Sequence, residues 1–174
     1  MPGVPKTKDE VYKVKRIPKS RFFDIDEISD KSTKLPHMLP TLQEFEKHME
    51  RLRIKGNDKL IIYDDEGILG ASRVLWTFHV FGVKSASVLD GGLPKWEKEV
   101  GKAETGEPSW TKGSRALKVD GTFKKNDALV KDMKQIQEWV TKPSKDFQLV
   151  DARAVARFKG LEPDPRGYLA GYNK

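Results

Sequence analysis

The chain of 174 residues contains no cysteine. This absence excludes disulfide bonds, thiolate metal sites and a cysteine nucleophile within the chain. The chain also lacks any apolar run that approaches the ~18 residues of a membrane-spanning helix. Residues 1–15 include Asp9 and Glu10 and no apolar core, so they resemble neither a signal peptide nor a transit peptide. We therefore expect an intracellular protein without a membrane partner.

A concentrated basic patch is also missing, although the formal net charge is +7. Lysines alternate with acidic residues in segments such as KDEVYKVKR and KWEKEV. The chain has neither a zinc-finger spacing nor a Gly-aromatic RNA-binding motif, so we expect no nucleic-acid partner. An excess of scattered cations instead suits a small anionic substrate, which the field of the protein attracts.

Apolar residues in the N-terminal half predict a strand and then a helix. Phe22, Phe23 and Ile25 predict a short buried strand. Thr41 predicts the start of a helix, because Glu44 follows at the position that a capping box requires. Four side chains recur at helical spacing and should face the core, namely Leu42, Phe45, Met49 and Leu52.

The segment 60–96 carries the most informative pattern. It alternates strands with helices, and the loop after its first strand opens on Asp64 and Asp65. Strands that alternate with helices in this way predict a parallel sheet. The expected elements are a buried strand at 59–63, a buried helix at 71–81 that stops at Gly82, a strand at 86–89 and a short helix from Pro94.

Beyond residue 100 the composition shifts to Gly, Ser, Thr, Lys and Pro without periodicity. Asp127 is expected to cap a helix lined by Met133, Ile136 and Val140, and 147–153 is expected to form a strand. One helix and one strand cannot bury their own apolar face, so we expect an incomplete second domain. We divide the chain into a mobile arm at 1–16, a first domain at 17–100, a linker at 101–126 and the start of a second domain at 127–174.

Five segments in this order resemble the tandem-domain rhodanese family, the thiosulfate and 3-mercaptopyruvate sulfurtransferases. They cover about residues 17–97 and 148–166. The FFDID and PHMLP pair and the DAR-xxx-RF-x-G-xx-P-x-PR pattern are its most specific parts. The segments are RIPKSRFFDIDEISDKST, LPHMLPTLQEFEKHM, LIIYDDEGILGASRVLW, FGVKSASVLDGGLPKW and VDARAVARFKGLEPDPR.

The resemblance implies an α/β fold with a mostly parallel sheet, helices on both faces and an incomplete second domain. The family has two such domains, and its inactive N-terminal domain carries Asp where the second domain carries cysteine. Asp64 occupies that position here. The first family strand before RIPKS and the G-H-I-P-G segment after PDPR have no counterpart, so both ends look truncated relative to the family.

The family reaction needs a cysteine thiolate that forms a persulfide and passes its sulfur to an acceptor. A thiolate of low pKa, cradled by loop N–H groups and cations, meets that need. A carboxylate cannot do so, because oxygen does not form a persulfide. We therefore expect Asp64 to mark a non-catalytic site and to accept N–H bonds from its own loop, as Asp does in turns.

Arg157 and Arg166 match two family arginines that hold the carboxylate of mercaptopyruvate. A planar guanidinium binds a carboxylate through two parallel hydrogen bonds, which explains the residue type. Without the resemblance, both would be interpreted as solvated arginines of a polar loop. Arg153 is expected to be structural and to tie the end of the predicted strand to its own domain.

Asp26 and His37 match family positions at the domain interface, where they are thought to form a relay with a serine of the cysteine loop. A histidine oriented by a carboxylate is suited to handle a proton. The alternative, that His37 only packs or hydrogen-bonds in a turn, stays open.

The other polar or aromatic candidates are expected to be structural. Arg73 should pair with Asp64 or Asp65, and Trp96 should cover the core. His48 is expected on an exposed helix and His79 in a buried one.

The resemblance implies a sulfurtransferase that moves sulfane sulfur from thiosulfate or 3-mercaptopyruvate to a thiophilic acceptor, with no cofactor and no metal. The chain lacks the nucleophile and is expected to be inactive alone. Its expected partners are a small anionic sulfur donor and either a sulfur-acceptor protein or a separate catalytic domain. The compartment is expected to be the cytoplasm or the mitochondrion. The alternative is a non-catalytic rhodanese-like binding module.

Overall fold

The computed structural model describes residues 11–108, 117–119 and 121–163. The chain divides into two compact units, of which the larger is Lys6–Val130 and the other contains Lys131–Lys174. Within the described ranges, no helix has both the length and the apolar character needed to cross a membrane.

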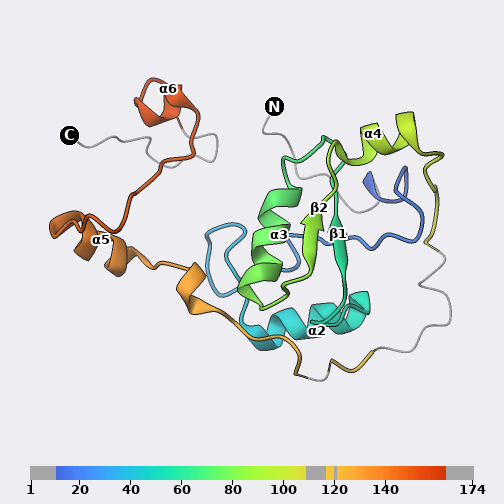
Figure 1. Ribbon diagram of the computed structural model, residues 1–174, viewed down its shortest axis with the longest axis horizontal. Coiled ribbons are helices and arrows are strands. Elements are labelled where there is room, and N and C mark those ends of the chain that lie inside the picture. Colours follow the sequence, from blue (N-terminus) through green and yellow to red (C-terminus); the bar gives the residue numbers. More distant parts are fainter. Residues whose placement is uncertain (1–10, 109–116, 120, 164–174) are drawn as a thin grey trace. The chain divides into compact units, whose positions relative to one another are not determined.

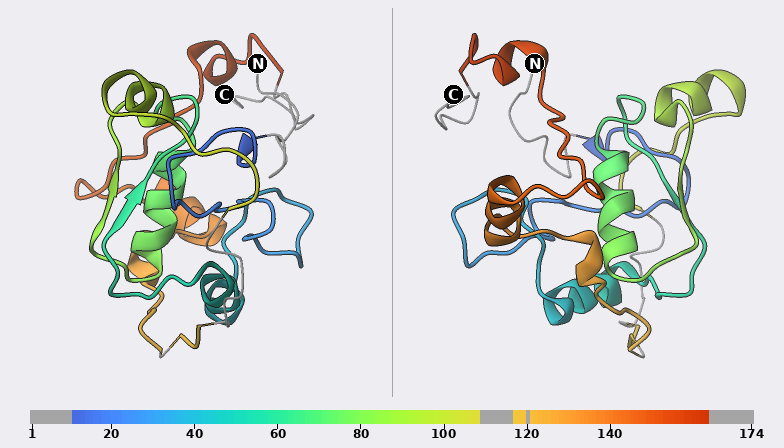
Figure 2. Two further views of the ribbon diagram at one scale, coloured as in Figure 1. Left: turned by 90° about the vertical axis from the view of Figure 1, so that its right-hand side faces the viewer. Right: turned by 60° about the vertical axis from the view of Figure 1, so that its left-hand side comes forward.

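The centre of the larger unit is a parallel pair of strands, β1 (Leu60–Ile62) and β2 (Ala86–Val88) (Figure 1). The helix α3 (Ala71–Val80) connects them and packs on both strands, which Figure 2 shows from two further directions. A helical crossover of this kind is what parallel strands require. The prediction of an α/β fold with a parallel sheet is confirmed.

The two faces of this sheet differ in burial. Leu60 and Ile62 pack against the core cluster, whereas Ile61, between them, is 66% exposed. Successive side chains of a strand point to opposite faces, so only one face of β1 contributes to the core. The prediction that this strand is buried throughout is therefore wrong for its middle residue.

The helix α2 (Leu42–Leu52) begins as its sequence predicts. The N–H of Glu44 donates to Oγ1 of Thr41 at 3.3 Å, and the N–H of Thr41 donates to Oε2 of Glu44 at 2.8 Å. This reciprocal pair is the predicted capping box. Phe45 and Met49 are fully buried, and Leu42 and Leu52 pack against the same cluster.

Aromatic rings form the middle of the core. The ring of Phe45 stacks on Phe81 at 3.9 Å between centroids and meets Phe78 and Phe123 edge-on at 5.8 and 5.3 Å. Phe123 belongs to the segment 101–126 that the composition indicated as a linker, yet it is buried. Apolar contact with Phe45 outweighs the polar character of its neighbours, so this part of the segment closes the core.

Residues 11–16 pack against the fold, although 1–16 was predicted to be a mobile arm. Residues 1–10 lie outside the described ranges, but Tyr12 and Arg16 are buried. The Nη1 atom of Arg16 donates to the main-chain oxygens of Tyr12 at 3.0 Å and Gly106 at 2.6 Å. Arg16 and Glu104 exchange two main-chain hydrogen bonds and form an ion pair at 3.2 Å. A buried guanidinium needs such partners, and they hold residues 11–16 against the fold.

The strand predicted from Phe22, Phe23 and Ile25 is absent, and these side chains are only half-buried. Asp24 turns the chain instead, since its Oδ1 accepts the N–H of Asp26 at 3.0 Å and that of Glu27 at 3.2 Å. An Asp side chain that bonds to the following backbone competes with strand formation.

The glycines predicted to form turns do so. Gly82 ends α3 with φ of +86°, and Gly91 and Gly92 also have positive φ. The helix α4 (Gly92–Glu99) begins two residues before Pro94, and Leu93 is its buried apolar residue. Trp96, predicted to cover the core, is half-buried.

The C-terminal elements are a 3₁₀ turn η2 (Asp127–Leu129) and the helices α5 (Met133–Thr141) and α6 (Val155–Phe158). Asp132, not Asp127, caps α5, because its side chain accepts the N–H of Gln135 at 2.8 Å. The strand predicted at 147–153 is absent: Phe147 is 60% exposed, and this segment has no strand partner among the described residues. A single segment without a neighbouring strand cannot satisfy its backbone as a sheet.

Candidate functional site

Asp64 follows β1 directly and organises the loop that leads to α3. Its Oδ2 accepts the N–H of Gly70 at 2.7 Å and that of Ala71 at 3.0 Å, and its Oδ1 accepts the N–H of Glu66 at 3.2 Å. The N-cap residue of α3, Gly70, has no side chain to bond the first helical amides. The carboxylate of Asp64 takes that task and places a negative charge at the positive end of the helix. The expected acceptance of N–H bonds from its own loop is confirmed.

The Gly-Gly turn after β2 holds the other side of this loop. The N–H of Leu93 donates to the main-chain oxygen of Asp64 at 3.0 Å. A Cβ atom on Gly92 would lie 2.6 Å from that oxygen and 2.7 Å from the oxygen of Gly67. Only a glycine fits at this distance, so the two loops form one closely packed unit at the carboxyl ends of the strands.

This geometry limits the chemistry of the loop. Three loop N–H groups that could bind an external anion already bind the Asp64 carboxylate. The chain has no cysteine to place there. Asp64 therefore stabilises the loop and cannot act as a sulfur nucleophile.

Asp26 and His37 lie side by side, as the resemblance predicts. The Nε2 atom of His37 is 2.9 Å from Oδ1 of Asp26, and both side chains are partly exposed. The turn made by Asp24 places Asp26, and the main-chain oxygen of Asp26 accepts hydrogen bonds from Ser29 and Lys31. A carboxylate only accepts hydrogen bonds, so Nε2 of His37 carries the proton between them.

The main chain of His37 has a φ of +58°, in the left-handed region. The next carbonyl, that of Met38, accepts the N–H of Asp30 at 3.0 Å. The carbonyl of His37 itself accepts a hydrogen bond from Nη2 of Arg73 at 2.6 Å. Two hydrogen bonds thus hold the turn that presents the imidazole.

The contact of Arg73 corrects a prediction. The sequence placed Arg73 against Asp64 or Asp65, but its guanidinium lies on the ring of Trp76, 4.7 Å from its centroid, and bonds to His37. The Asp64 oxygens accept three backbone N–H groups of their own loop, whereas the guanidinium of Arg73 reaches the main-chain oxygen of His37. Partial burial lowers the pKa of Arg73. No local pattern in the sequence signals its contact with His37.

The candidate arginines belong to the C-terminal unit. Arg157 lies on α6 and is half-buried, and Arg166 lies outside the described residues. Arg153 forms hydrogen bonds of 2.9 and 3.0 Å from Nε and 2.6 Å from Nη2 to Asp151. Asp26 and His37 belong to the larger unit.

The remaining histidines are half-buried. Burial lowers the pKa of His48, and the positive charge of Arg51 adds to that effect. His79 lies on α3, where its main-chain oxygen accepts the N–H of Gly82 at 3.0 Å. Neither histidine joins a cluster that could hold a metal among the described residues.

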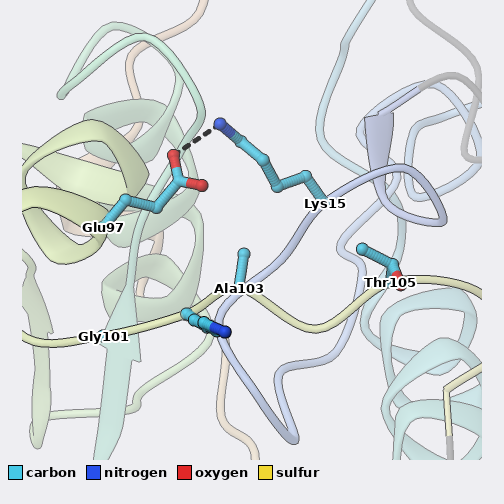
Figure 3. A pocket seen from close by; sticks show the side chains of 6 residues that line it. Lys15, Glu97, Gly101, Ala103 and Thr105 are labelled. Atoms are coloured by element: carbon cyan, nitrogen blue, oxygen red, sulfur yellow. Dashed lines mark hydrogen bonds and ion pairs between the residues drawn. The ribbon is translucent and has the colours of Figure 1, made fainter.

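A shallow cavity of about 470 Å³ lies between residues 15 and 97–105 (Figure 3). An ion pair between Lys15 and Glu97 spans it. None of the predicted site residues lines it. The lining residues are Lys15, Glu97, Gly101, Lys102, Ala103 and Thr105.

The curated proteins to which the chain is similar include sulfurtransferases of a plant and of an animal. The chain is 35% identical over 188 aligned residues to the thiosulfate/3-mercaptopyruvate sulfurtransferase 1, mitochondrial, of Arabidopsis thaliana, with 99% of the chain and 49% of the relative covered. It is 36% identical to the 3-mercaptopyruvate sulfurtransferase of Homo sapiens, with 89% and 50% covered. The chain thus spans about half the length of these curated relatives.

A solved structure supports the same assignment. The crystal structure of the Tum1 protein from Saccharomyces cerevisiae superposes with a TM-score of 0.79 at 29% identity and covers 94% of this chain and 54% of its own. The family model described as a rhodanese-like domain matches residues 6–99. This match includes β1, the Asp64 loop, α3 and the Asp26–His37 pair. The chain belongs to the rhodanese-like domain family and is homologous to the thiosulfate and 3-mercaptopyruvate sulfurtransferases.

Proposed function

We propose that the chain forms the non-catalytic N-terminal part of a sulfurtransferase that moves sulfane sulfur from thiosulfate or 3-mercaptopyruvate to a thiophilic acceptor. In this proposal 17–100 forms the non-catalytic domain, 101–126 leads from it to the second domain while its Phe123 packs in the core of the first, and 127–174 is the start of a second domain whose cysteine lies outside this chain. The chain alone is inactive. The observation that carries the proposal is the Asp64 carboxylate, bound by three loop N–H groups in a chain without cysteine.

The proposed contribution to the reaction comes from Asp26 and His37. With Nε2–H directed at Asp26, the neutral imidazole keeps a lone pair on Nδ1. Such a nitrogen accepts a proton during attack or returns one to the leaving group. Arg157 and Arg166 are proposed to bind the carboxylate of the donor, a task that suits the guanidinium group.

The names of the relatives support the proposed donors. One is a thiosulfate/3-mercaptopyruvate sulfurtransferase and the other a 3-mercaptopyruvate sulfurtransferase. The first is also named as mitochondrial, which supports a mitochondrial compartment here, with the cytoplasm as the other candidate.

The first experiment uses the chain alone. Purified chain is incubated with thiosulfate or 3-mercaptopyruvate, and its mass and the formation of thiocyanate from cyanide are measured. We expect no added sulfur and no thiocyanate. Gain of a sulfur atom by the isolated chain would contradict the proposal.

The second experiment restores a nucleophile. The chain is fused to the half of the human 3-mercaptopyruvate sulfurtransferase that lies outside the match. We expect sulfur transfer from 3-mercaptopyruvate, and about 100-fold loss of kcat in His37→Gln, since a proton-handling group contributes at least that factor. The matched control is His48→Gln, which should keep kcat. A folded fusion that binds the donor but transfers no sulfur would count against the proposal.

A non-catalytic binding module is the second candidate, and the exposed apolar tip of the Asp64 loop favours it. Leu69 is 79% exposed, and its neighbour Ile68 is also largely exposed. Exposed apolar residues at a loop tip are suited to contact another protein. If Leu69→Ser leaves the activity of the fusion unchanged but releases a bound protein, this candidate gains support over the first.

A further inference from the structure

We propose that Arg73 is the positioning residue for the Asp26–His37 pair and that Asp64 fixes the place from which Arg73 acts. The inference rests on the proposed function, because it concerns the task of His37 in sulfur transfer. In this proposal the Asp64 loop helps to orient His37, a role that requires no thiol.

The contact itself carries the first step. Nη2 of Arg73 donates to the main-chain oxygen of His37 at 2.6 Å. Among the described residues, Arg73 has no carboxylate partner, unlike Arg16 and Arg153. A hydrogen bond from a charged donor is stronger than one between neutral groups, so it can hold a turn in place. The ring of Trp76 lies against the guanidinium and fixes its orientation.

The conformation of His37 shows why it needs such a partner. Its φ of +58° is uncommon for a residue with a side chain, although histidine is tolerated there better than most residues. A conformation of this kind persists when surrounding contacts hold it. Two hydrogen bonds hold the main chain here. Arg73 donates to the oxygen of His37, and the N–H of Asp30 donates to the oxygen of Met38. If His37 left this left-handed conformation, its Cα–Cβ bond would point in another direction relative to the preceding chain, and the imidazole would lose its position beside Asp26.

Asp64 connects to this arrangement through α3. Its carboxylate binds the N–H groups of Gly70 and Ala71, where the helix begins. Arg73 stands in the first turn of the same helix and reaches the His37 loop from there. The acid that replaces the thiol therefore anchors the helix end that presents Arg73, and Arg73 in turn orients the imidazole whose Nε2 faces Asp26.

The test on the chain alone measures the ring nitrogens of the histidines by NMR, assigned with His48→Gln and His79→Gln. In the unchanged chain we expect a single His37 tautomer with the proton on Nε2. In Arg73→Met we expect a mixture of tautomers at His37, with His48 and His79 unchanged. Arg73→Lys, which keeps a charged donor, should restore most of the original signal. The matched control Arg51→Met, at an exposed arginine of α2, should leave His37 unchanged.

Folding is checked in every variant by circular dichroism. If Arg73→Met does not fold, Arg73→Gln replaces it, because that side chain is polar but too short to reach the His37 oxygen. An unchanged His37 tautomer in a folded Arg73→Met or Arg73→Gln variant overturns the proposal.

The fused enzyme supplies a second readout through a double-mutant cycle. Arg73→Met should lower kcat about 10-fold with little change in KM, since small misplacements of a reacting group have effects of this size or larger. In the His37→Gln background it should have no further effect on kcat. Equal losses in both backgrounds would show that Arg73 acts elsewhere and overturn the proposal. A fusion without any sulfur transfer would reject the proposed function, whereas the NMR result would still decide the role of Arg73.

Discussion

The main-chain oxygen of Asp64 lies 2.6 Å from the position that a Cβ atom on Gly92 would take. Gly92 also has a φ of +54°, which side chains rarely adopt. The Gly-Gly turn and the Asp64 loop therefore depend on each other for their shape. The Gly-Gly turn that the sequence predicted thus allows the two loops to approach this closely.

Replacement of Gly92 by alanine should destabilise the larger unit and displace the Asp64 loop. The methyl group meets main-chain oxygens of Asp64 and Gly67, which cannot move as a flexible side chain would. We expect a loss of about 1–3 kcal/mol in the free energy of unfolding, measured by urea denaturation. Gly101→Ala is the matched control, because nothing lies within 4 Å of its added Cβ and its φ is not positive. Equal effects of the two substitutions would contradict the close approach.

The capping box of α2 gives a prediction for pH. Hydrogen bonds from the N–H and the hydroxyl of Thr41 lower the pKa of Glu44 below its ordinary 4.5. A carboxylate with a depressed pKa contributes stability that is fully present above the unfolded value and is lost as pH falls through the folded value. Urea denaturation between pH 6 and pH 3, ranges chosen about these values, should show the unfolding free energies of the unchanged chain and Glu44→Gln converging at the acid end. Glu46→Gln is the control. A difference that stays constant over the whole range would contradict the role of the Glu44 charge.

The α2 helix was predictable because its signals are local. Thr41 and Glu44 are three residues apart, and the apolar stripe through Phe45 and Met49 follows one helical face. The strand expected at Phe22–Ile25 failed for the opposite reason. A strand needs a partner that the sequence does not identify, and the side chain of Asp24 offered the backbone a turn instead.

In the candidate site, too, the local contacts were predictable from the sequence and the contacts between distant segments were not. The bonds of the Asp64 carboxylate to its own loop follow from local turn chemistry. The pairing of Asp26 with His37 came from the resemblance alone, since nothing in their spacing requires it. Arg73 was assigned to nearby carboxylates because they are close in sequence, whereas its partner His37 approaches through the fold.

Phe123 provides a test of how much of the segment after residue 100 belongs to the fold. Its ring meets Phe45 at 5.3 Å in a buried cluster. Phe123→Ala should lower the free energy of unfolding by about 3–5 kcal/mol, because removal of a buried ring leaves a cavity. The control is Phe147→Ala, at a ring that is 60% exposed, for which we expect less than about 0.5 kcal/mol. Thermal or urea denaturation followed by circular dichroism measures both. A small effect at Phe123 would show that the segment is a free linker.

Replacement of Asp64 by cysteine tests whether the loop N–H groups form an anion-binding site in the absence of the carboxylate. In Asp64→Cys the N–H groups of Glu66, Gly70 and Ala71, together with the positive end of α3, would face sulfur instead of oxygen. These groups favour a thiolate, so the thiol pKa should fall below the ordinary ~8.5. The chain has no other cysteine, so the pH dependence of iodoacetamide alkylation reports on this position alone.

The comparison variant is Ser87→Cys, at an exposed position in the middle of β2, whose thiol should titrate near the ordinary value of ~8.5. Asp64→Ala is measured alongside by urea denaturation and should lose about 1–2 kcal/mol, as expected when the first amides of a helix lose their acceptor. A lowered thiol pKa at position 64 would mean that the loop N–H groups stay convergent without the carboxylate. Equal pKa values at positions 64 and 87 would mean that the Asp64 carboxylate itself builds the loop. In that case the loop would be a structural anchor for α3 rather than an anion site.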